Sequence, residues 1–342
     1  MPFIVRFERR LMFSCFGKPK TINPKPAKGI QHEVEPIIKA EPIIPAESSK
    51  AKSSDMPDFK VDKNDIEIGP KPIGQGGCGV VSIGMWKKQE FVAIKKFKSS
   101  SNEDETKINF VSFQNEKEML MKISQLHEYS KYIVKFIGVI DDTSFVIEYL
   151  DGSNLLDYYN NNSANIDLIQ VLQILLNIAY ALNFLHTNSF VHGDLKPENI
   201  MITSLGLLKL IDFGFTRITN SETDNASGSP IYVAPELLGN PPYIYTEKVD
   251  IYAFSMLLYA LFLGSPYPPT DSIQDIFAKV LNNNRPRIPS NTLLPPKVSG
   301  LMQATWLQSP KLRPDAKAVI EELKEIQSEE IQSEENKKTM RI

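Results

Sequence analysis

Three side chains between Phe190 and Gly214 have the types and spacing to bind a cation and accept a proton. Asp194 and Asn199 lie in the run FVHGDLKPENIMI with the spacing H-x-D-x-x-x-x-N, and Asp212 follows within Asp-Phe-Gly. Asp194 could take a proton from a hydroxyl group, while the other two could hold a metal ion. Phosphoryl transfer needs such groups, because its transition state depends on positioning and on cations that offset phosphate charge. The pattern therefore indicates a phosphoryl-transfer site.

A glycine-rich segment lies upstream, where residues 74–81 read GQGGCGVV and match G-x-G-x-x-G-x-V. Glycines let the main chain lie close over phosphates. The same pattern also opens dinucleotide-binding folds and flexible hairpins. A dinucleotide-binding unit would continue directly into a helix, whereas residues 80–86 and 91–95 here have the composition of strands. The sequence therefore favours a strand, a glycine turn and a second strand.

Lys95 ends the strand predicted at residues 91–95, in the tetrapeptide VAIK. An isolated lysine at a strand end is usually a solvated cation. Here Ala93 lies on the same face two residues earlier, so a flat base has room while the ammonium group reaches phosphates. Apolar periodicity predicts a helix over residues 108–123. Its best-placed acidic partner for Lys95 is Glu116, and Glu118 is expected to face solvent.

With these motifs in this order, the chain resembles a eukaryotic protein kinase domain from Ile66 to Ile326. The resemblance extends through Ala-Pro-Glu at 234–236, Asp250 and Trp306 with Arg313. It implies an α+β, two-lobed fold with a small, mostly antiparallel β lobe that has one main helix and a large, mostly α-helical lobe. The small lobe would span 66–147, the hinge 148–151 and the large lobe 152–326. The glutamate of Ala-Pro-Glu and Arg313 would pair inside the large lobe.

The resemblance also implies ATP and Mg²⁺ as cofactors and assigns roles to the motif residues. A lysine would bind the α- and β-phosphates and a glutamate would orient it, while one aspartate would be the base and a second lysine would steady the transferring phosphate. These catalytic residues would be Lys95, Glu116, Asp194 and Lys196, in that order. The magnesium ligands would be Asn199 and Asp212.

The nucleotide pocket follows from the same resemblance. Residues 148–150 would form the hinge that meets adenine, with Ile147 guarding the space behind it. Asn154 occupies a position that often contacts ribose, although a helix-capping role is an equal alternative. The residues expected around the nucleotide are Ile73, Gly74, Gln75, Gly76, Gly77, Cys78, Gly79, Val81, Ala93, Lys95, Glu148, Leu150, Asn154 and Met201.

The expected activity is transfer of the γ-phosphate of Mg-ATP to serine and threonine hydroxyls of proteins in intracellular signalling. The segment Lys-Pro-Glu at 196–198 is typical of serine/threonine kinases, and Ser229 stands where that type has a serine or threonine near the substrate. EYLDGSNLLDYY, VDIYAFSMLLYAL and RPRIP are instead similar to the tyrosine-kinase-like group, so a dual-specificity enzyme remains an alternative.

Two other functions are less compatible with the sequence. A catalytically silent kinase-fold scaffold usually lacks one of the six catalytic and metal-binding residues, and all six are present here. A small-molecule kinase of similar fold usually lacks the activation segment that ends in Ala-Pro-Glu. His192 is expected to be a packing residue behind Phe213 rather than an acid, base or metal ligand.

Gly193 departs from the commonest family pattern, because it stands where many relatives have an arginine. Where that arginine is present, a phosphate on the activation segment neutralises it and orders the segment. Without this cation, we hypothesise that activity does not depend strongly on phosphorylation of residues 215–231. The many hydroxyl groups of this segment would then belong to an exposed polar loop.

Composition indicates an intracellular, cytoplasmic enzyme. The only cysteines are Cys15 and Cys78, so no disulfide framework is implied, and neither they nor the four histidines have metal-ligand spacing. A net charge of -3, with the basic cluster confined to the amino-terminal tail, argues against nucleic acid as a partner. No apolar run is expected to approach the ~20 residues of a membrane span. The most hydrophobic helix, over residues 171–185, is assigned to the core of the large lobe.

The ends of the chain are predicted to be extensions. Residues 1–60 are rich in proline and lysine and are expected to be disordered. Within them, EPII occurs at 35–38 and again at 41–44, which could dock in a partner's groove, although a plain linker is favoured. Residues 1–20 surround Cys15 with basic and aromatic side chains and could contact a membrane surface. A helix after Pro314 is expected to pass into an acidic, polar tail at 327–342 that forms a solvated helix.

Overall fold

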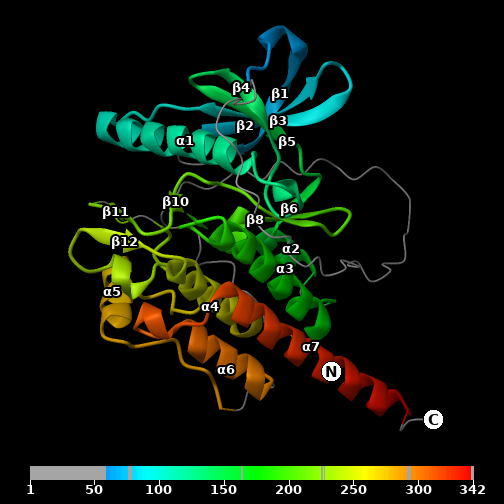
Figure 1. Cartoon of the computed structure of the whole chain (residues 1–342), viewed down its shortest axis with the longest axis vertical. Helices are drawn as coiled ribbons and strands as arrows, with labels where there is room; N and C mark the ends of the chain where they lie inside the picture. The colour runs from blue at the N-terminus through cyan, green and yellow to red at the C-terminus, as the bar shows by residue number, and fades with distance from the viewer. Residues whose placement is uncertain are drawn as a thin grey trace.

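The computed structural model describes residues 59–75, 79–162, 165–224, 226, 228–290 and 294–339. Within these ranges the chain forms two lobes, with a β-sheet and one helix in the upper lobe of Figure 1 and helices in the lower lobe. Gly76, Gly77, Cys78 and the first 58 residues lie outside the described residues. The predictions made for them, including the EPII repeats and the environment of Cys15, therefore have no structural counterpart here.

The small lobe contains a five-stranded antiparallel sheet in the order β1-β2-β3-β5-β4. The register places Ala93 opposite Ile83 on one side and opposite Ile147 on the other, so β3 lies at the centre of the sheet. Strands β1 and β2 pair antiparallel on either side of the glycine turn, as predicted. The strands are β1 (Ile66–Gln75), β2 (Gly79–Trp86), β3 (Glu90–Phe97), β4 (Phe136–Asp141) and β5 (Ser144–Glu148).

Helix α1 (Glu103–Ile123) packs against this sheet through Phe113, whose ring lies 5.2 Å from that of Phe145. The helix begins five residues before the predicted start at 108. The side chain of Asn102 accepts hydrogen bonds from the main chain of Asp104 and Glu105, and acidic residues in the first turn favour a helix amino terminus. Apolar periodicity could not detect this first turn, because its side chains are polar.

The core of the large lobe is built on α3 (Leu168–Thr187), which begins with a capping box between Asp167 and Gln170. By length and composition α3 is the one helix in the described part of the chain that could span a membrane, which is weak evidence because a buried core helix meets the same criterion. Most of its apolar side chains are buried within the lobe, as predicted for residues 171–185. The other large-lobe helices are α2 (Leu155–Asn162), α4 (Lys248–Leu263), α5 (Ile273–Leu281), α6 (Pro296–Thr305) and α7 (Ala316–Thr339).

Short strands position the loops between the lobes. The loop that carries Asp194 lies between β7 and β8, and Asp212 follows β9 after one residue. Strands β6, β8 and β9 form one sheet, while β10 pairs with β7 and β11 pairs with β12. These strands are β6 (Gly152–Asn154), β7 (Phe190–Val191), β8 (Ile200–Thr203), β9 (Leu208–Leu210), β10 (Arg217–Ile218), β11 (Ser221–Thr223) and β12 (Tyr243–Tyr245).

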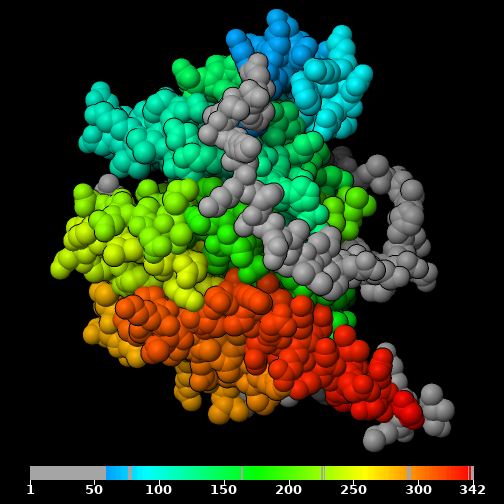
Figure 2. Space-filling view, viewed as in Figure 1, coloured from blue at the N-terminus to red at the C-terminus, as the bar shows by residue number. Residues whose placement is uncertain are grey.

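Helix α7 runs without a break through the predicted domain boundary at residue 326. Its first half buries Val319, Leu323 and Ile326. After Ile326 most of its side chains are half-buried or exposed, and the helix projects beyond the body of the molecule in Figure 2. The acidic repeat thus forms a solvated helical extension, as its composition predicted.

Candidate active site

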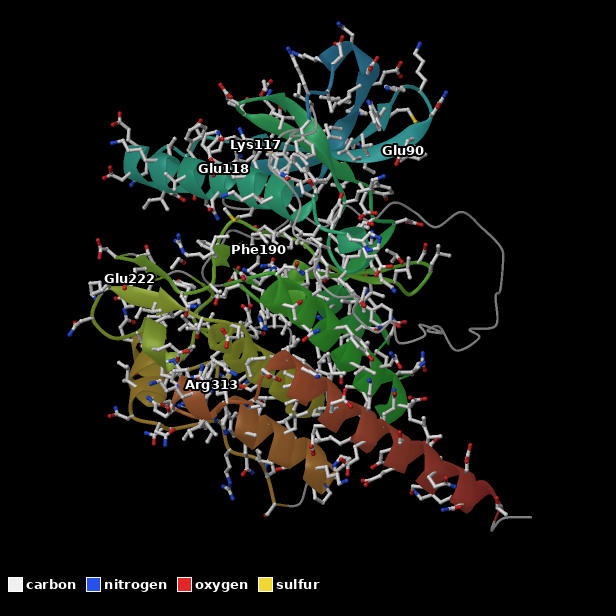
Figure 3. All side chains as sticks on the ribbon, viewed as in Figure 1. Glu90, Lys117, Glu118, Phe190, Glu222 and Arg313 are labelled. Atoms are coloured by element: carbon white, nitrogen blue, oxygen red, sulfur yellow. The ribbon has the colours of Figure 1, made fainter. Side chains whose placement is uncertain are left out.

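Lys95 and Glu116 meet between β3 and α1. The Lys95 ammonium donates a hydrogen bond to Oε2 of Glu116, and both side chains are largely buried. Burial raises the pKa of Glu116 to about 7, while the charge of Lys95 acts in the opposite direction. Glu118 is exposed on α1, where Figure 3 labels it. The helical periodicity therefore placed the correct acid beside Lys95.

Asp194 is the centre of a hydrogen-bonded group in the loop after β7. The Lys196 ammonium lies 2.5 Å from Oδ2 of Asp194, and the Asn199 amide donates to the same oxygen at 3.0 Å. The other carboxylate oxygen accepts hydrogen bonds from the main-chain N–H of Ser229 at 2.8 Å and from its hydroxyl at 2.9 Å. Lys196 also donates to the Ser229 hydroxyl at 2.9 Å. Burial opposes the charge of Lys196, yet the carboxylate of Asp194 raises its pKa above the ordinary value.

Asp250 on α4 holds the main chain of the loop that carries Asp194. Its carboxylate accepts hydrogen bonds from the main-chain N–H groups of His192 and Gly193, both at 2.9 Å, and lies 2.8 Å from Nε2 of His186. Although burial acts in the opposite direction, these hydrogen bonds and the histidine lower the pKa of Asp250. In Figure 3, Phe190 at the start of the loop lies between α1 and the large-lobe helices.

His192 lies behind Phe213, as expected. Both side chains are fully buried and their ring centroids are 5.1 Å apart. The ring nitrogen Nε2 of His192 lies 3.2 Å from the main-chain oxygen of Ile211. These contacts fit a packing residue.

Asp212 fits a magnesium ligand by its charge and its exposure. Its backbone is left-handed, with φ of 63°, and its side chain is 40% exposed. Partial burial favours the protonated form of Asp212. The charge of Lys95, whose ammonium lies 3.9 Å from Oδ1 of Asp212, and the charge of Lys196 nevertheless lower the pKa of Asp212 below its ordinary value. The carboxylate is therefore ionised at neutral pH.

Asn199 completes the set of candidate metal ligands. Its amide nitrogen donates to Asp194, which leaves the amide oxygen as the atom able to ligate a cation. The main-chain oxygen of Asn199 accepts from Ile211, the residue before Asp212. Across the described ranges, no group of three or more His, Cys, Asp or Glu side chains forms a metal cage. Two oxygen ligands from the protein suit Mg²⁺, which is commonly bound by one or two carboxylates together with substrate phosphates.

The residues predicted to surround the nucleotide base line the strands that meet at the hinge. Val81 lies opposite Lys95 in the sheet, and Met201 lies opposite Asn154. Ala93 is buried and Ile73 is half exposed, whereas Val81, Leu150 and Met201 are half-buried. Gly74 and Gln75 end β1, and Gly79 begins β2. The described members of the predicted pocket thus lie on two sheets, with Val81 and Ala93 in the small-lobe sheet and Met201 and Asn154 in the sheet of β6, β8 and β9.

Two polar members of the predicted pocket have side-chain partners within the protein. Glu148 is paired through its side chain with Lys209 and accepts from the main chain of Lys135, so only its main chain is left to meet a base. All three residues of β9 are buried, so no local pattern singles out Lys209 as this partner. Asn154 accepts from the main chain of Asp157 at 2.9 Å and donates to its carboxylate at 3.0 Å. This is the helix-capping role at the start of α2.

The described part of the segment from Phe215 to Ile231 has more regular structure than the exposed polar loop that its composition suggested. Thr216 is fully buried and donates to the main-chain oxygen of His192 at 3.2 Å. Strands β10 and β11 then pair with β7 and β12, which uses main-chain hydrogen bonds that side-chain composition cannot report. The polar-loop interpretation is therefore wrong for Thr216 and for both strands.

Arg313 and Glu236 form the pair expected inside the large lobe. The two guanidinium nitrogens of Arg313 lie 2.7 and 2.8 Å from the two carboxylate oxygens of Glu236. Arg313 is 2% exposed and also donates to the main-chain oxygen of Lys248. Figure 3 shows Arg313 among the large-lobe helices. Its role is structural.

Comparison with known proteins agrees with this geometry. The protein kinase domain profile matches residues 69–323. The chain belongs to the protein kinase family. It is 32% identical to a Dictyostelium discoideum protein named as a probable serine/threonine-protein kinase, over 79% of this chain and 29% of that protein. It is 27% identical to the Arabidopsis thaliana serine/threonine-protein kinase STY17, over 79% of this chain and 46% of that protein.

The predicted family and the predicted two-lobed fold are thus confirmed. The chain spans less than half the length of these curated relatives. Protein kinases as a family use ATP and Mg²⁺ and act on proteins.

Proposed function

We propose that this kinase transfers the γ-phosphate of Mg-ATP to serine and threonine hydroxyl groups of proteins. One observation carries the proposal. The hydrogen-bonded group of Asp194, Lys196 and Ser229 lies next to an ion-paired Lys95 and an ionised Asp212. Phosphoryl transfer requires a base, cations beside the phosphates and a metal ligand in one place, and these residues supply them.

Asp194 and Lys196 act on the transferred group and its acceptor. The buried carboxylate of Asp194 accepts a hydrogen bond from the incoming hydroxyl group and then its proton. The Lys196 ammonium, held against the same carboxylate, offsets negative charge on the transferring phosphate. The Ser229 hydroxyl lies against both groups and marks where the acceptor approaches.

Lys95 and Glu116 act on the nucleotide. Glu116 holds the Lys95 ammonium at the end of β3, where it contacts the phosphates before transfer. Magnesium, when bound by Asn199 and Asp212 together with the phosphates, neutralises charge on the phosphate oxygens. All of these side chains come from rigid strands, from α1 or from a loop anchored by Asp250, which supports a catalytically competent kinase over a silent scaffold.

Transfer from Mg-ATP to an array of serine, threonine and tyrosine peptides tests the proposal. Wild-type protein should label serine and threonine peptides, and Asp194→Asn and Lys95→Met should both eliminate the labelling. Lys96→Met is the matched control for the lysine, because Lys96 is the exposed neighbour on the same strand. Strong tyrosine labelling would show a dual-specificity enzyme, and no labelling by folded wild-type protein would support the scaffold.

The amino-terminal extension carries two further proposals. We propose that the kinase is cytoplasmic, and that residues 1–20, with Cys15, can attach it peripherally to membranes. The support is the mixture of basic and aromatic residues around that cysteine. Replacement of Cys15 by serine should then release a membrane-bound fraction, and an unchanged distribution would contradict attachment through this residue. We also propose that the EPII repeats dock in the groove of a partner protein. Changing both isoleucine pairs to serine should then abolish binding of that partner.

A further inference from the structure

Asn115 joins α1 to the segment that follows Asp212. Its amide nitrogen lies 3.0 Å from the main-chain oxygen of Gly214, 3.0 Å from that of Thr216 and 3.4 Å from that of Phe213. One amide group of a small-lobe helix thus donates to a cluster of main-chain acceptors in the loop that carries the candidate metal ligand. This contact is separate from the ion pair of Glu116, the next residue.

A second contact comes from the preceding turn of the same helix. The hydroxyl group of Ser112, which is 8% exposed, donates to the main-chain oxygen of Gly214 at 3.3 Å. Space around this contact is small, because a Cβ atom on Gly214 would lie 2.5 Å from the Ser112 oxygen. The loop after Asp212 therefore fits closely against α1 at two turns.

This geometry couples two parts of the candidate active site. Glu116 holds Lys95, and the residue beside it holds the main chain after Asp212. If α1 moves away from the sheet, the ion pair and the loop contacts break together. While α1 stays in place, Asn115 holds the main chain of Gly214 and Thr216, which follow the left-handed Asp212. Both features must be in place for catalysis in a protein kinase.

We propose that Asn115 is a positioning residue that makes the Lys95–Glu116 ion pair and the metal-binding orientation of Asp212 form as one unit. The inference rests on the proposed kinase function. It supplies a means of ordering the start of the activation segment in a chain whose residue 193 is glycine and offers no cation to a phosphate. Asn115 acts through Asp212 and does not itself touch the phosphates.

Gln114 provides a matched control on the same helix. Its amide nitrogen donates to the main-chain oxygen of Asp142 at 2.7 Å, in the turn between β4 and β5. Gln114→Ala therefore removes one side-chain to main-chain hydrogen bond from α1 without touching the segment after Asp212. Any general effect of shortening an amide side chain on this helix will appear in both alanine variants.

Hydrogen exchange of the full chain without nucleotide tests the coupling directly. The Thr216 amide, which donates to the main-chain oxygen of Phe213 at 3.1 Å, lies within the reporting segment. Asn115→Ala should increase exchange in a peptide covering residues 212–218 by about tenfold, because the lost hydrogen bonds favour local opening. Gln114→Ala should leave that peptide at the wild-type rate. Equal exchange in Asn115→Ala and wild type would overturn the inference, whether or not the protein transfers phosphate.

Kinetics distinguish positioning from a general loss of stability. Asn115→Ala should lower kcat about tenfold and raise the Mg²⁺ concentration needed for half-maximal rate, because Asp212 spends less time in the binding orientation. Asn115→Gln retains the donor and should recover part of the rate. Asn115→Asp has the same size but places a carboxylate against carbonyl oxygens, so it should not recover. An Mg²⁺ dependence equal to that of Gln114→Ala would contradict the inference, whereas an inactive wild type would contradict the proposed function.

Discussion

Gly193 and Phe215 are in close main-chain contact. A Cβ atom placed on Gly193 would lie 2.5 Å from the main-chain oxygen of Phe215, and the backbone of Gly193 is left-handed, with φ of 78°. The close contact and the left-handed backbone therefore require glycine at this position. Gly193, which stands in place of the common arginine, is thus also the residue that the main chain of Phe215 contacts.

Replacement of Gly193 by alanine should destabilise the loop by about 1–3 kcal/mol, because it combines a steric overlap with an unfavourable backbone conformation. Phosphate transfer should fall with it, since Asp194 is the next residue. Gly193→Arg should be no better, so added positive charge alone should not produce a phosphorylation-dependent enzyme. Denaturant unfolding and peptide phosphorylation measure the two effects.

Gly239→Ala is the control for this prediction. A Cβ atom there would have no heavy atom within 4 Å, so stability and activity should stay near wild type. If Gly193→Ala behaved like Gly239→Ala, the proposed steric requirement at the loop would be wrong.

Apart from those of Thr216 and Ser229, the hydroxyl groups of the activation segment should be dispensable for turnover. Combined replacement of Thr219, Ser221, Thr223 and Ser227 by alanine should leave turnover within about threefold of wild type, because no cation at residue 193 awaits a phosphate. The measurement is kcat on the best array peptide, with mass spectrometry to record the phosphorylation state. Loss of turnover in a folded variant would contradict the hypothesis of phosphorylation-independent activity.

Thr216 should behave differently from those hydroxyl residues. It is fully buried and donates to His192, so Thr216→Ala should reduce stability as well as activity. Thr216→Ser keeps the hydroxyl group and should preserve most of both.

Glu116 should give the enzyme a pH dependence near neutrality. Its pKa of about 7 means that the carboxylate loses a proton, and the charged pair with Lys95 forms, as the pH rises through 7. Activity should therefore increase between pH 6 and 8. The effect on stability has the opposite sign, because the folded state holds a proton that the unfolded chain has released between about pH 4.5 and 7, so this group's contribution falls as the pH rises through that range.

Profiles of kcat/KM for ATP from pH 6 to 8.5 test this prediction. Glu116→Gln should lower the rate by about tenfold or more and remove the inflection near pH 7. Glu118→Gln changes an exposed acid on the same helix and should retain the inflection. An inflection that survives in Glu116→Gln would assign the titration to another group.

Arg313 should be essential for the stability of the large lobe. Arg313→Ala leaves the Glu236 carboxylate without its bidentate partner, which should lower the free energy of unfolding by about 3–5 kcal/mol. Lys297→Ala is a useful comparison, because Lys297 bridges Glu325 and Glu329 at an exposed site where ion pairs contribute little. Equal melting temperatures for the two variants would contradict the structural role of Arg313.

The local sequence was sufficient wherever a short pattern and a periodicity coincided. The pairing of β1 and β2 followed from the strand composition on either side of the glycine turn. The choice of Glu116 over Glu118 followed from the helical spacing of apolar residues, since that spacing decides which side of a helix is buried. The core helix α3 followed from the same kind of pattern.

Contacts between distant segments were beyond the sequence. Nothing in the order of residues indicates that Asn115 reaches the main chain of Gly214, or that Lys209 takes the side chain of Glu148. The sequence groups Thr216 with several exposed hydroxyl residues. In the structure it lies directly before β10, which pairs with β7, and it is fully buried.

The sequence by itself determined the family, the two-lobed fold and the residues proposed for phosphoryl transfer, because these depend on side-chain types at short, fixed spacings. Only the tertiary structure decided how those residues are held. The anchoring of the catalytic loop by Asp250, the enclosure of Gly193 by Phe215 and the contact of Asn115 with the loop after Asp212 all join segments far apart in the chain. Their formation depends on how the lobes pack, which local patterns do not encode.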